Sequence, residues 1–293
     1  MKDDAPSPGI LFLVATPIGN LEDVSLRALR VLGEVGMIAA EDTRHTRKLL
    51  SNHGIKTRLI SYREQNHSRA TGQILAELEA GHDVALVSDA GTPALSDPGQ
   101  ALVAAILDKG FRVVPVPGPV AAITALTASG LPSDRFLFKG FLPRKQSALR
   151  KLAAELATEP GTLVFYESPR RIAKTLLLLA AEWGPRDAVV VRELTKVHET
   201  FHRGTLVELA EEFSEGCRGE VTLVISGATE LKPSFSPDWQ ELVEVLRSGA
   251  RPAAGKLAGL VGRLSGLGRN EAYRLLQGRG HVTGGGESND EEP

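Results

Sequence analysis

Short runs of consecutive apolar residues alternate with longer segments whose apolar positions recur every three to four residues. The apolar runs predict buried strands at 10–16, 36–43, 58–64, 83–93 and 112–119. The periodic segments between them predict helices at 25–32, 44–54, 69–81, 99–110 and 121–130. Strands that alternate with helices favour a parallel sheet with crossover helices. The first half of the chain is therefore predicted to be an α/β domain.

The same alternation starts again after the segment "RFLFKGFLPRK" and predicts a second α/β domain that ends near Gly227. A segment with prolines and serines, 228–238, reads as a linker, and short helical patterns follow it. The predicted organisation is a flexible N-terminus, two α/β domains, a linker with a small helical basic unit, and a disordered acidic tail. Their ranges are 1–9, 10–130, 131–229, 230–281 and 282–293.

Composition narrows the class of protein. The apolar content of 42% over 293 residues supports real cores, and Cys217 is the only cysteine, so a cysteine-based zinc site is excluded. The first residues, "MKDDAPSPG", lack the features of a signal peptide, and we find no apolar run long enough to span a membrane. We expect a soluble cytoplasmic protein. The net charge of −2 conceals basic stretches at 41–72 and 251–281.

Three turns at predicted strand ends combine glycine, proline and small residues: "ATPIGNLED", "SDAGTPALSDPG" and "VPGPVAAITAL". Ligands of open α/β sheets bind outside the carboxyl ends of the strands, and glycine permits a close approach of the backbone. Ala121 and Ala122 would leave room for a flat ring, and Asp89 and Asp97 could accept hydrogen bonds from hydroxyl groups. The phosphate-binding patterns of dinucleotide and P-loop sites are missing. A ligand with adenine, ribose and an amino acid but no phosphate, such as S-adenosylmethionine, fits these turns.

Other strand ends carry charge. "AEDTRHT" places carboxylates beside Arg44, either for acid–base chemistry or as an ion pair with a helix cap. "RELTK" and "FYESPRR" add charges that suit phosphates or RNA. "HETFH" matches a zinc-protease pattern, but that pattern needs a helix, whereas Thr200 and Phe201 favour a strand or loop. We therefore expect no metal site there.

Together these segments resemble one family. "TPIGNLEDVSLRAL", "AEDTR", "VSDAGTPALSDPG", "PVPGPVAAITALTASGL", "GFLPRK", "FYESPRRI", "RELTKVHE" and "GEVTLVI" are similar to the bacterial ribosomal RNA small-subunit methyltransferase I family. That family belongs to the tetrapyrrole methylase superfamily of S-adenosylmethionine-dependent enzymes. The resemblance covers roughly residues 10–280 and implies a cofactor folded between two α/β domains, and a homodimer. The implied cofactor contacts are Thr16, Pro17, Asp89, Gly91, Thr92, Val120, Ala121, Tyr166 and Glu167.

The implied activity is methyl transfer from S-adenosylmethionine to the ribose 2′-OH of a cytidine in the decoding region of 16S rRNA, on the small ribosomal subunit. A ribose hydroxyl is a weak nucleophile until its proton leaves, so a base or a local positive charge helps. Candidate bases are Glu41, Asp42 and Glu193, and Lys196 would stabilise an oxyanion or act as base if its pKa were lowered. No metal is required. The candidate RNA contacts are Arg44, Arg144, Lys145, Arg170 and Arg171.

Two other interpretations stay open. The chain could methylate a small molecule such as a tetrapyrrole, although "AEDTR", "RELTK" and the basic C-terminal unit argue against this. It could instead be a non-catalytic RNA-binding assembly factor, in which case RNA binding would not respond to cofactor. The basic unit itself is either a second RNA contact or a small cap domain.

Overall fold

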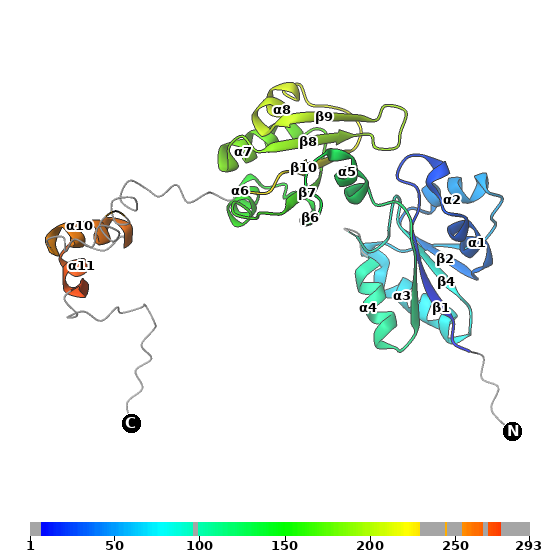
Figure 1. The fold of residues 1–293 in the computed structure, drawn as a ribbon. Helices are drawn as coiled ribbons and strands as arrows, with labels where there is room; N and C mark the ends of the chain where they lie inside the picture. The colour runs from blue at the N-terminus through cyan, green and yellow to red at the C-terminus, as the bar shows by residue number, and fades with distance from the viewer. Residues whose placement is uncertain (1–6, 96–98, 229–243, 245–253, 266–268, 277–293) are drawn as a thin grey trace, which may run out of the picture. The chain divides into compact units, whose positions relative to one another are not determined.

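The computed structural model describes residues 7–95, 99–228, 244, 254–265 and 269–276. The chain divides into two compact units, Met1–Thr229 and Glu230–Pro293. Unit one holds two sheets with helices, which confirms the predicted α/β class (Figure 1). Asp97, the acidic tail at 282–293 and most of the helical pattern at 239–249 lie outside the described residues. None of the described helices is long and apolar enough to cross a membrane.

The first sheet is parallel throughout, as predicted, in the order β3-β2-β4-β1-β5. Its strands are β1 (Ile10–Val14), β2 (Met37–Ala40), β3 (Leu59–Ser61), β4 (Val84–Val87) and β5 (Arg112–Val116). Its helices are α1 (Leu26–Glu34), α2 (Thr43–Asn52), α3 (His67–Glu79) and α4 (Gly99–Asp108), with short 3-10 turns at Leu21–Asp23 and Glu64–Asn66. Both sheet faces are covered, which explains the continuous apolar runs. Side chains of α1 and α2 pack in one core cluster, and those of α3 and α4 in another.

The strand order creates a topological switch point between β1 and β4. From β1 the chain passes through α1 to β2, beyond β4, whereas from β4 it passes through α4 to β5, on the other side of β1. The helices α1 and α4 that follow these strands therefore pack in different core clusters, and a crevice is left at the carboxyl ends of β1 and β4. Ligands of such sheets bind there.

The second sheet is mixed, in the order β6-β7-β10-β8-β9. Its strands are β6 (Phe136–Phe141), β7 (Thr162–Glu167), β8 (Asp187–Arg192), β9 (Thr200–Thr205) and β10 (Val221–Ile225). Only the β6–β7 pair is parallel; the β7–β10, β10–β8 and β8–β9 pairs are antiparallel. The strand β9 occupies the end of the "HETFH" segment, where we expected strand or loop rather than helix.

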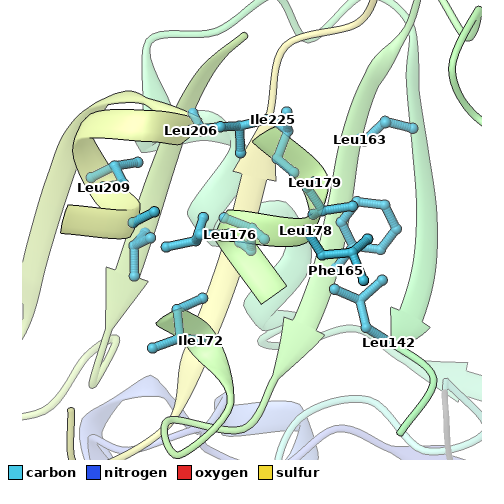
Figure 2. Close-up of a cluster of buried hydrophobic side chains, with 14 of the residues drawn as sticks. Leu142, Leu163, Phe165, Ile172, Leu176, Leu178, Leu179, Leu206, Leu209 and Ile225 are labelled. Carbon is cyan, nitrogen blue, oxygen red and sulfur yellow. The ribbon is translucent and has the colours of Figure 1, made fainter. Parts of the chain in front are cut away.

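One face of this sheet packs against α6 (Gln146–Glu155), α7 (Ile172–Trp183) and α8 (Leu206–Glu212). Figure 2 shows this core, in which Phe165 of β7 lies among leucines from the helices. The opposite face packs against α5 (Ala121–Ser129), whose Ala122, Ala125 and Leu126 are buried there. The predicted first domain, 10–130, includes α5, and this helix packs on the second sheet.

Unit two is described as α10 (Ala254–Ser265) and α11 (Arg269–Leu276), which pack against each other. Ala258, Leu260 and Ala272 are buried within this pair. Both helices fall within 230–281, the range in which the sequence predicts a linker and a small helical basic unit.

Candidate active site

A cavity of about 520 Å³ lies within unit one, lined by loops from both sheets. Its volume is within the range of small-molecule sites. Loops of the first sheet contribute Ile18, Glu41, Ser88, Asp89, Ala90, Gly91, Thr92 and Leu95. The start of α5, which packs on the second sheet, contributes Val120 and Ala121. The second sheet and its loops contribute Phe141, Tyr166, Glu167, Ser168, Pro169, Val191, Leu194, Gly219, Glu220, Val221 and Thr222. Apolar walls with a few carboxylates and hydroxyls suit an amphiphilic ligand.

The floor of the cavity is built where the loops after β1 and β4 meet. Thr16 and Gly91 exchange two backbone hydrogen bonds, of 2.9 and 3.0 Å, and the buried Thr16 hydroxyl donates to the Ser88 carbonyl at 3.2 Å. Gly91 has φ +79°, and an added Cβ would lie 3.2 Å from the Ile18 side chain. A glycine is therefore needed at this position.

Thr92 connects the third glycine- and proline-containing loop to this floor, because its hydroxyl donates to the Pro119 carbonyl at 3.1 Å. Asp89 accepts the Asp42 backbone N–H at 2.8 Å, which brings the "AEDTR" strand end alongside the "SDAGTP" loop. These hydrogen bonds bring the three glycine- and proline-containing turns and the first acidic strand end together at one edge of the sheet.

Seven of the nine predicted cofactor residues line the cavity: Asp89, Gly91, Thr92, Val120, Ala121, Tyr166 and Glu167. Thr16 lies behind the wall, paired with Gly91, and Pro17 follows it outside the described lining. Tyr166 accepts the Ala122 N–H at 3.2 Å, at the start of α5, and its burial raises the pKa of its phenol.

Glu167 is almost fully buried, and three donors satisfy it. It accepts the Ser168 N–H and the Thr175 hydroxyl, each at 2.6 Å, and lies 3.2 Å from the Arg171 guanidinium. Arg171 also donates to the carbonyls of Leu142 and Pro143, at 3.3 and 2.6 Å. These contacts hold the β6–α6 connection against the end of β7. The guanidinium of Arg171, a predicted RNA contact, is therefore bonded to groups of the protein itself, although 28% of the side chain is exposed.

The candidate bases fall into different environments. Glu41 lines the cavity, and its carbonyl accepts from Arg63 Nε at 2.8 Å. Asp42 caps α2 by accepting the Arg44 N–H at 2.8 Å, and its carboxylate pairs with the Arg44 guanidinium at 2.7 Å. Hydrogen bonds from Arg44 hold the pKa of Asp42 well below its usual range, so Asp42 is a weak base. The cap and ion pair that we considered for this residue are both present.

Glu193 and Lys196 belong to a turn stabilised by charge. The Lys196 ammonium lies 2.9 Å from Glu193 and 3.0 Å from Glu220, and Glu193 also accepts the Glu220 N–H at 2.8 Å. Burial alone would lower the pKa of Lys196, but the hydrogen bonds to both carboxylates outweigh it and raise that pKa. The hydrogen bond from Lys196 lowers the pKa of Glu193. The raised pKa favours the cationic form of Lys196, which suits the stabilisation of an oxyanion better than the role of base.

This turn also contacts the loop after β1. Glu193 and Thr195 have φ of +52° and +65°, which is uncommon for residues with a Cβ. Thr195 Oγ1 accepts the Asn20 N–H at 3.1 Å. Gly19 lies so close to the turn that an added Cβ would be 2.6 Å from Lys196 Cγ. The left-handed residues shape the turn so that it meets the first sheet's loop at one side of the cavity.

The other predicted RNA contacts, Arg44, Arg144, Lys145 and Arg170, are exposed. In the "HETFH" segment, His202 bonds Glu212 at 2.5 Å and Thr200 at 3.0 Å, so both of its ring nitrogens have partners. Among the residues that the structure describes, no group of three or more His, Cys, Asp and Glu is placed to hold a metal.

Sequence reasoning missed several residues of the cavity, notably Phe141, Ser168, Glu220 and Thr222. Ser168 follows Tyr166 and Glu167 directly at the end of β7, so the expectation that ligands bind at the carboxyl ends of strands would have found it. Phe141 and Glu220 lack such a signal, because a bulge and a charge pair bring them to the site.

The family described as Tetrapyrrole (Corrin/Porphyrin) Methylases matches residues 11–210. A Synechocystis protein named "Ribosomal RNA small subunit methyltransferase I" is 51% identical over 82% of this chain and 86% of its own length. Pseudomonas aeruginosa and Escherichia coli O157:H7 proteins of the same name are 44% and 43% identical, over 94% and 92% of this chain and 99% and 94% of their own lengths.

Among solved structures, a cobalt precorrin-4 methyltransferase shares the fold with TM-score 0.57 and 15% identity, over 74% of this chain and 94% of its own. A uroporphyrin-III-C-methyltransferase from Thermus thermophilus has TM-score 0.52 and 22% identity, over 75% of this chain and 93% of its own. The chain therefore belongs to the tetrapyrrole methylase family, within the group of relatives named ribosomal RNA small subunit methyltransferase I.

Proposed function

We propose that this protein is an S-adenosylmethionine-dependent methyltransferase that methylates the ribose 2′-OH of a cytidine in the decoding region of 16S rRNA. The observation that supports this most is the cavity at the switch point, combined with relatives of nearly full length that carry an rRNA methyltransferase name. The cytidine and its 2′-OH come from the family resemblance of the sequence. A cytoplasmic homodimer acting on the small ribosomal subunit belongs to the same proposal.

The residues of the cavity fit S-adenosylmethionine. Gly91, Ala121 and Val120 leave apolar space for a flat ring, while the Asp89 carboxylate can accept from hydroxyls or an amine. The site has none of the glycine patterns that grip a pyrophosphate, and this ligand has no phosphate. When bound, its sulfonium supplies the electrophilic methyl group for an in-line displacement.

The protein must position the ribose and accept the 2′-OH proton. Of the candidate bases, only Glu41 lines the described part of the cavity, so we assign the proton to its carboxylate. Hydrogen bonds from Arg44 and Lys196 lower the pKa values of Asp42 and Glu193, which weakens both carboxylates as bases. The Lys196 cation stays beside Glu220 at the wall, where it offsets the charge of that carboxylate.

RNA would be held by exposed basic residues around the cavity: Arg44, Arg144, Lys145 and Arg170. Arginine and lysine contact phosphates without reading sequence, so these contacts fix the register of the RNA. Arg171 is left out of this set because its guanidinium is used by internal carbonyls and Glu167. The described helices α10 and α11 carry further basic residues, and their part in RNA binding stays a prediction.

The assignment of Glu41 is tested with E41Q. We expect E41Q to bind S-adenosylmethionine as the wild type does but to lose about 100-fold or more in the rate of methyl transfer to small subunits. The matched control is E64Q, a change of an exposed carboxylate in the Glu64–Asn66 turn. Full transfer by E41Q would show that another group accepts the proton, whereas equal loss in E64Q would show a general effect of charge.

A further inference from the structure

One large apolar side chain at the cavity is left mostly uncovered. Phe141, at the end of β6, lines the cavity but is 67% exposed. Its ring centroid lies 5.4 Å from that of Tyr166, which is in turn 5.0 Å from that of Phe138. Three aromatic rings therefore run from the buried side of the sheet out to the rim of the cavity. An exposed phenyl ring at such a place has a face to offer to a flat ligand.

A β-bulge puts Phe141 in this position. Phe138 pairs with Val164, but Phe141 pairs with Tyr166, so three steps along β6 match two along β7. The extra residue falls at Lys139–Gly140, where Gly140 has φ +68°. Side chains alternate between faces along a strand, so a regular β6 would place residue 141 on the face opposite to Tyr166. Bulges commonly redirect side chains next to active sites.

The charges around Phe141 indicate the chemical class of its occupant. Arg144 and Lys145 are exposed and follow Phe141 after three and four residues, and Arg170 follows Pro169, which lines the cavity. A phenyl face with cations beside it is how proteins hold unpaired nucleotides, by stacking the base and contacting the phosphates. Of the nine predicted cofactor contacts, five lie on loops of the first sheet, and Tyr166 of β7 is the one whose ring neighbours Phe141.

We infer that Phe141 stacks the base of the nucleotide whose ribose is methylated, and so holds that nucleotide out of its RNA helix at the rim of the cavity. This inference rests on the proposed function, since it requires a nucleotide substrate. An enzyme that acts on a single nucleotide must extract it from neighbouring bases, and the flipped base needs a surface that replaces the lost stacking. Phe141 supplies that surface, and Arg144 and Lys145 supply charges for the adjoining phosphates.

The test compares F141L, F141W and F136L. Leucine keeps an apolar side chain without an aromatic face, and tryptophan keeps the face. Phe136 is the matched control because it lies on the same strand, is 41% exposed and is outside the described lining. Base stacking on an aromatic ring is worth about 1–3 kcal/mol, so F141L should lose about 5- to 150-fold in kcat/KM for methyl transfer to small subunits. F136L should stay within about threefold of the wild type, F141W should lose less kcat/KM than F141L because it keeps an aromatic face, and all three should bind S-adenosylmethionine within about twofold by calorimetry.

Wild-type activity of F141L would overturn the inference, because an aromatic face would then be unnecessary. A loss of S-adenosylmethionine affinity in F141L as large as the loss in kcat/KM would also overturn it, because the ring would then be part of the cofactor wall. Ultraviolet crosslinking of the wild-type protein to 16S rRNA gives an independent readout, with Phe141 as the expected crosslinked residue. If the wild type transfers no methyl group to RNA, the proposed reaction fails, and a crosslink at Phe141 would then show an RNA contact but not the stacked substrate nucleotide that the inference requires. If transfer proceeds but crosslinks form elsewhere, stacking alone fails.

Discussion

The buried Glu167 allows a sharp test of how the cavity wall is held. Its carboxylate accepts hydrogen bonds from Ser168 N–H and the Thr175 hydroxyl and lies 3.2 Å from Arg171. E167Q keeps the shape but removes the charge, and it turns an amide N–H₂ toward donors. A hydrogen bond to a buried charged group contributes about 1.5–3 kcal/mol, so we expect the free energy of unfolding to fall by that amount. In a unit of this size, such a loss lowers the midpoint of thermal unfolding by about 3–12 °C.

Thermal unfolding followed by circular dichroism measures this change. E182Q is the matched control, because Glu182 is an exposed residue of the helix α7 that carries Thr175. T175V removes one donor, and its effect should be non-additive with that of E167Q by about 0.5 kcal/mol or more, since the two side chains share a hydrogen bond. A midpoint for E167Q equal to that of E182Q would refute the reasoning that this buried network stabilises the wall.

Three further changes test other parts of the site. D89A removes a cavity carboxylate, so it should bind S-adenosylmethionine about tenfold or more weakly than the wild type by calorimetry. D23A, a change at an exposed position, is the control and should bind as the wild type does. Equal affinity of D89A and the wild type would remove Asp89 from the site. G19A would place a Cβ 2.6 Å from Lys196 Cγ and 3.0 Å from the Leu194 carbonyl, so it should weaken cofactor binding and lower the free energy of unfolding. G33A is the control and should do neither, because its Cβ would meet nothing within 4 Å. A G19A protein as stable as the wild type would show that the turn can shift at little cost. The hydrogen bond from Lys196 lowers the pKa of Glu193, so this carboxylate stabilises the fold above the unfolded pKa and ceases to do so as the pH falls through the folded value. E193Q should therefore be less stable than the wild type at pH 7, and urea unfolding should show the gap closing below about pH 4; a gap independent of pH would contradict the assigned pKa shift.

Much of the fold could be read from the hydrophobic pattern. The parallel first sheet was predictable because both of its faces are covered, so that β2 and β4 appear as unbroken apolar runs. The second sheet was harder to predict in detail. Its antiparallel pairings bring β10 between β7 and β8, and no local pattern in the sequence encodes that order. The packing of α5 on the second sheet was hidden for the same reason, since the chain passes from one core to the other within a single short connection.

The candidate site, like the fold, was predictable from the sequence only in part. The small residues and carboxylates of the strand-end turns were found because glycine and proline mark such turns in the sequence. Phe141 was missed because its position depends on a one-residue bulge, which reverses the face on which a side chain lies. Arg171 was placed at the surface because its neighbours are charged, yet its partners are carbonyls that only the tertiary fold brings near. The positions of Phe141 and Arg171 are thus set by contacts with residues far away in the sequence, rather than by residue type.

The most direct measurement for the central claim is transfer of a labelled methyl group from S-adenosylmethionine to small ribosomal subunits that lack modifications, followed by mass analysis of the nucleosides. The proposed reaction predicts 2′-O-methylcytidine as the labelled product, at a position in the decoding region of 16S rRNA. Absence of transfer to subunits and to free 16S rRNA, by a protein that still binds S-adenosylmethionine, would contradict it and favour a small-molecule substrate. Loss of cofactor binding as well would favour a non-catalytic RNA-binding protein.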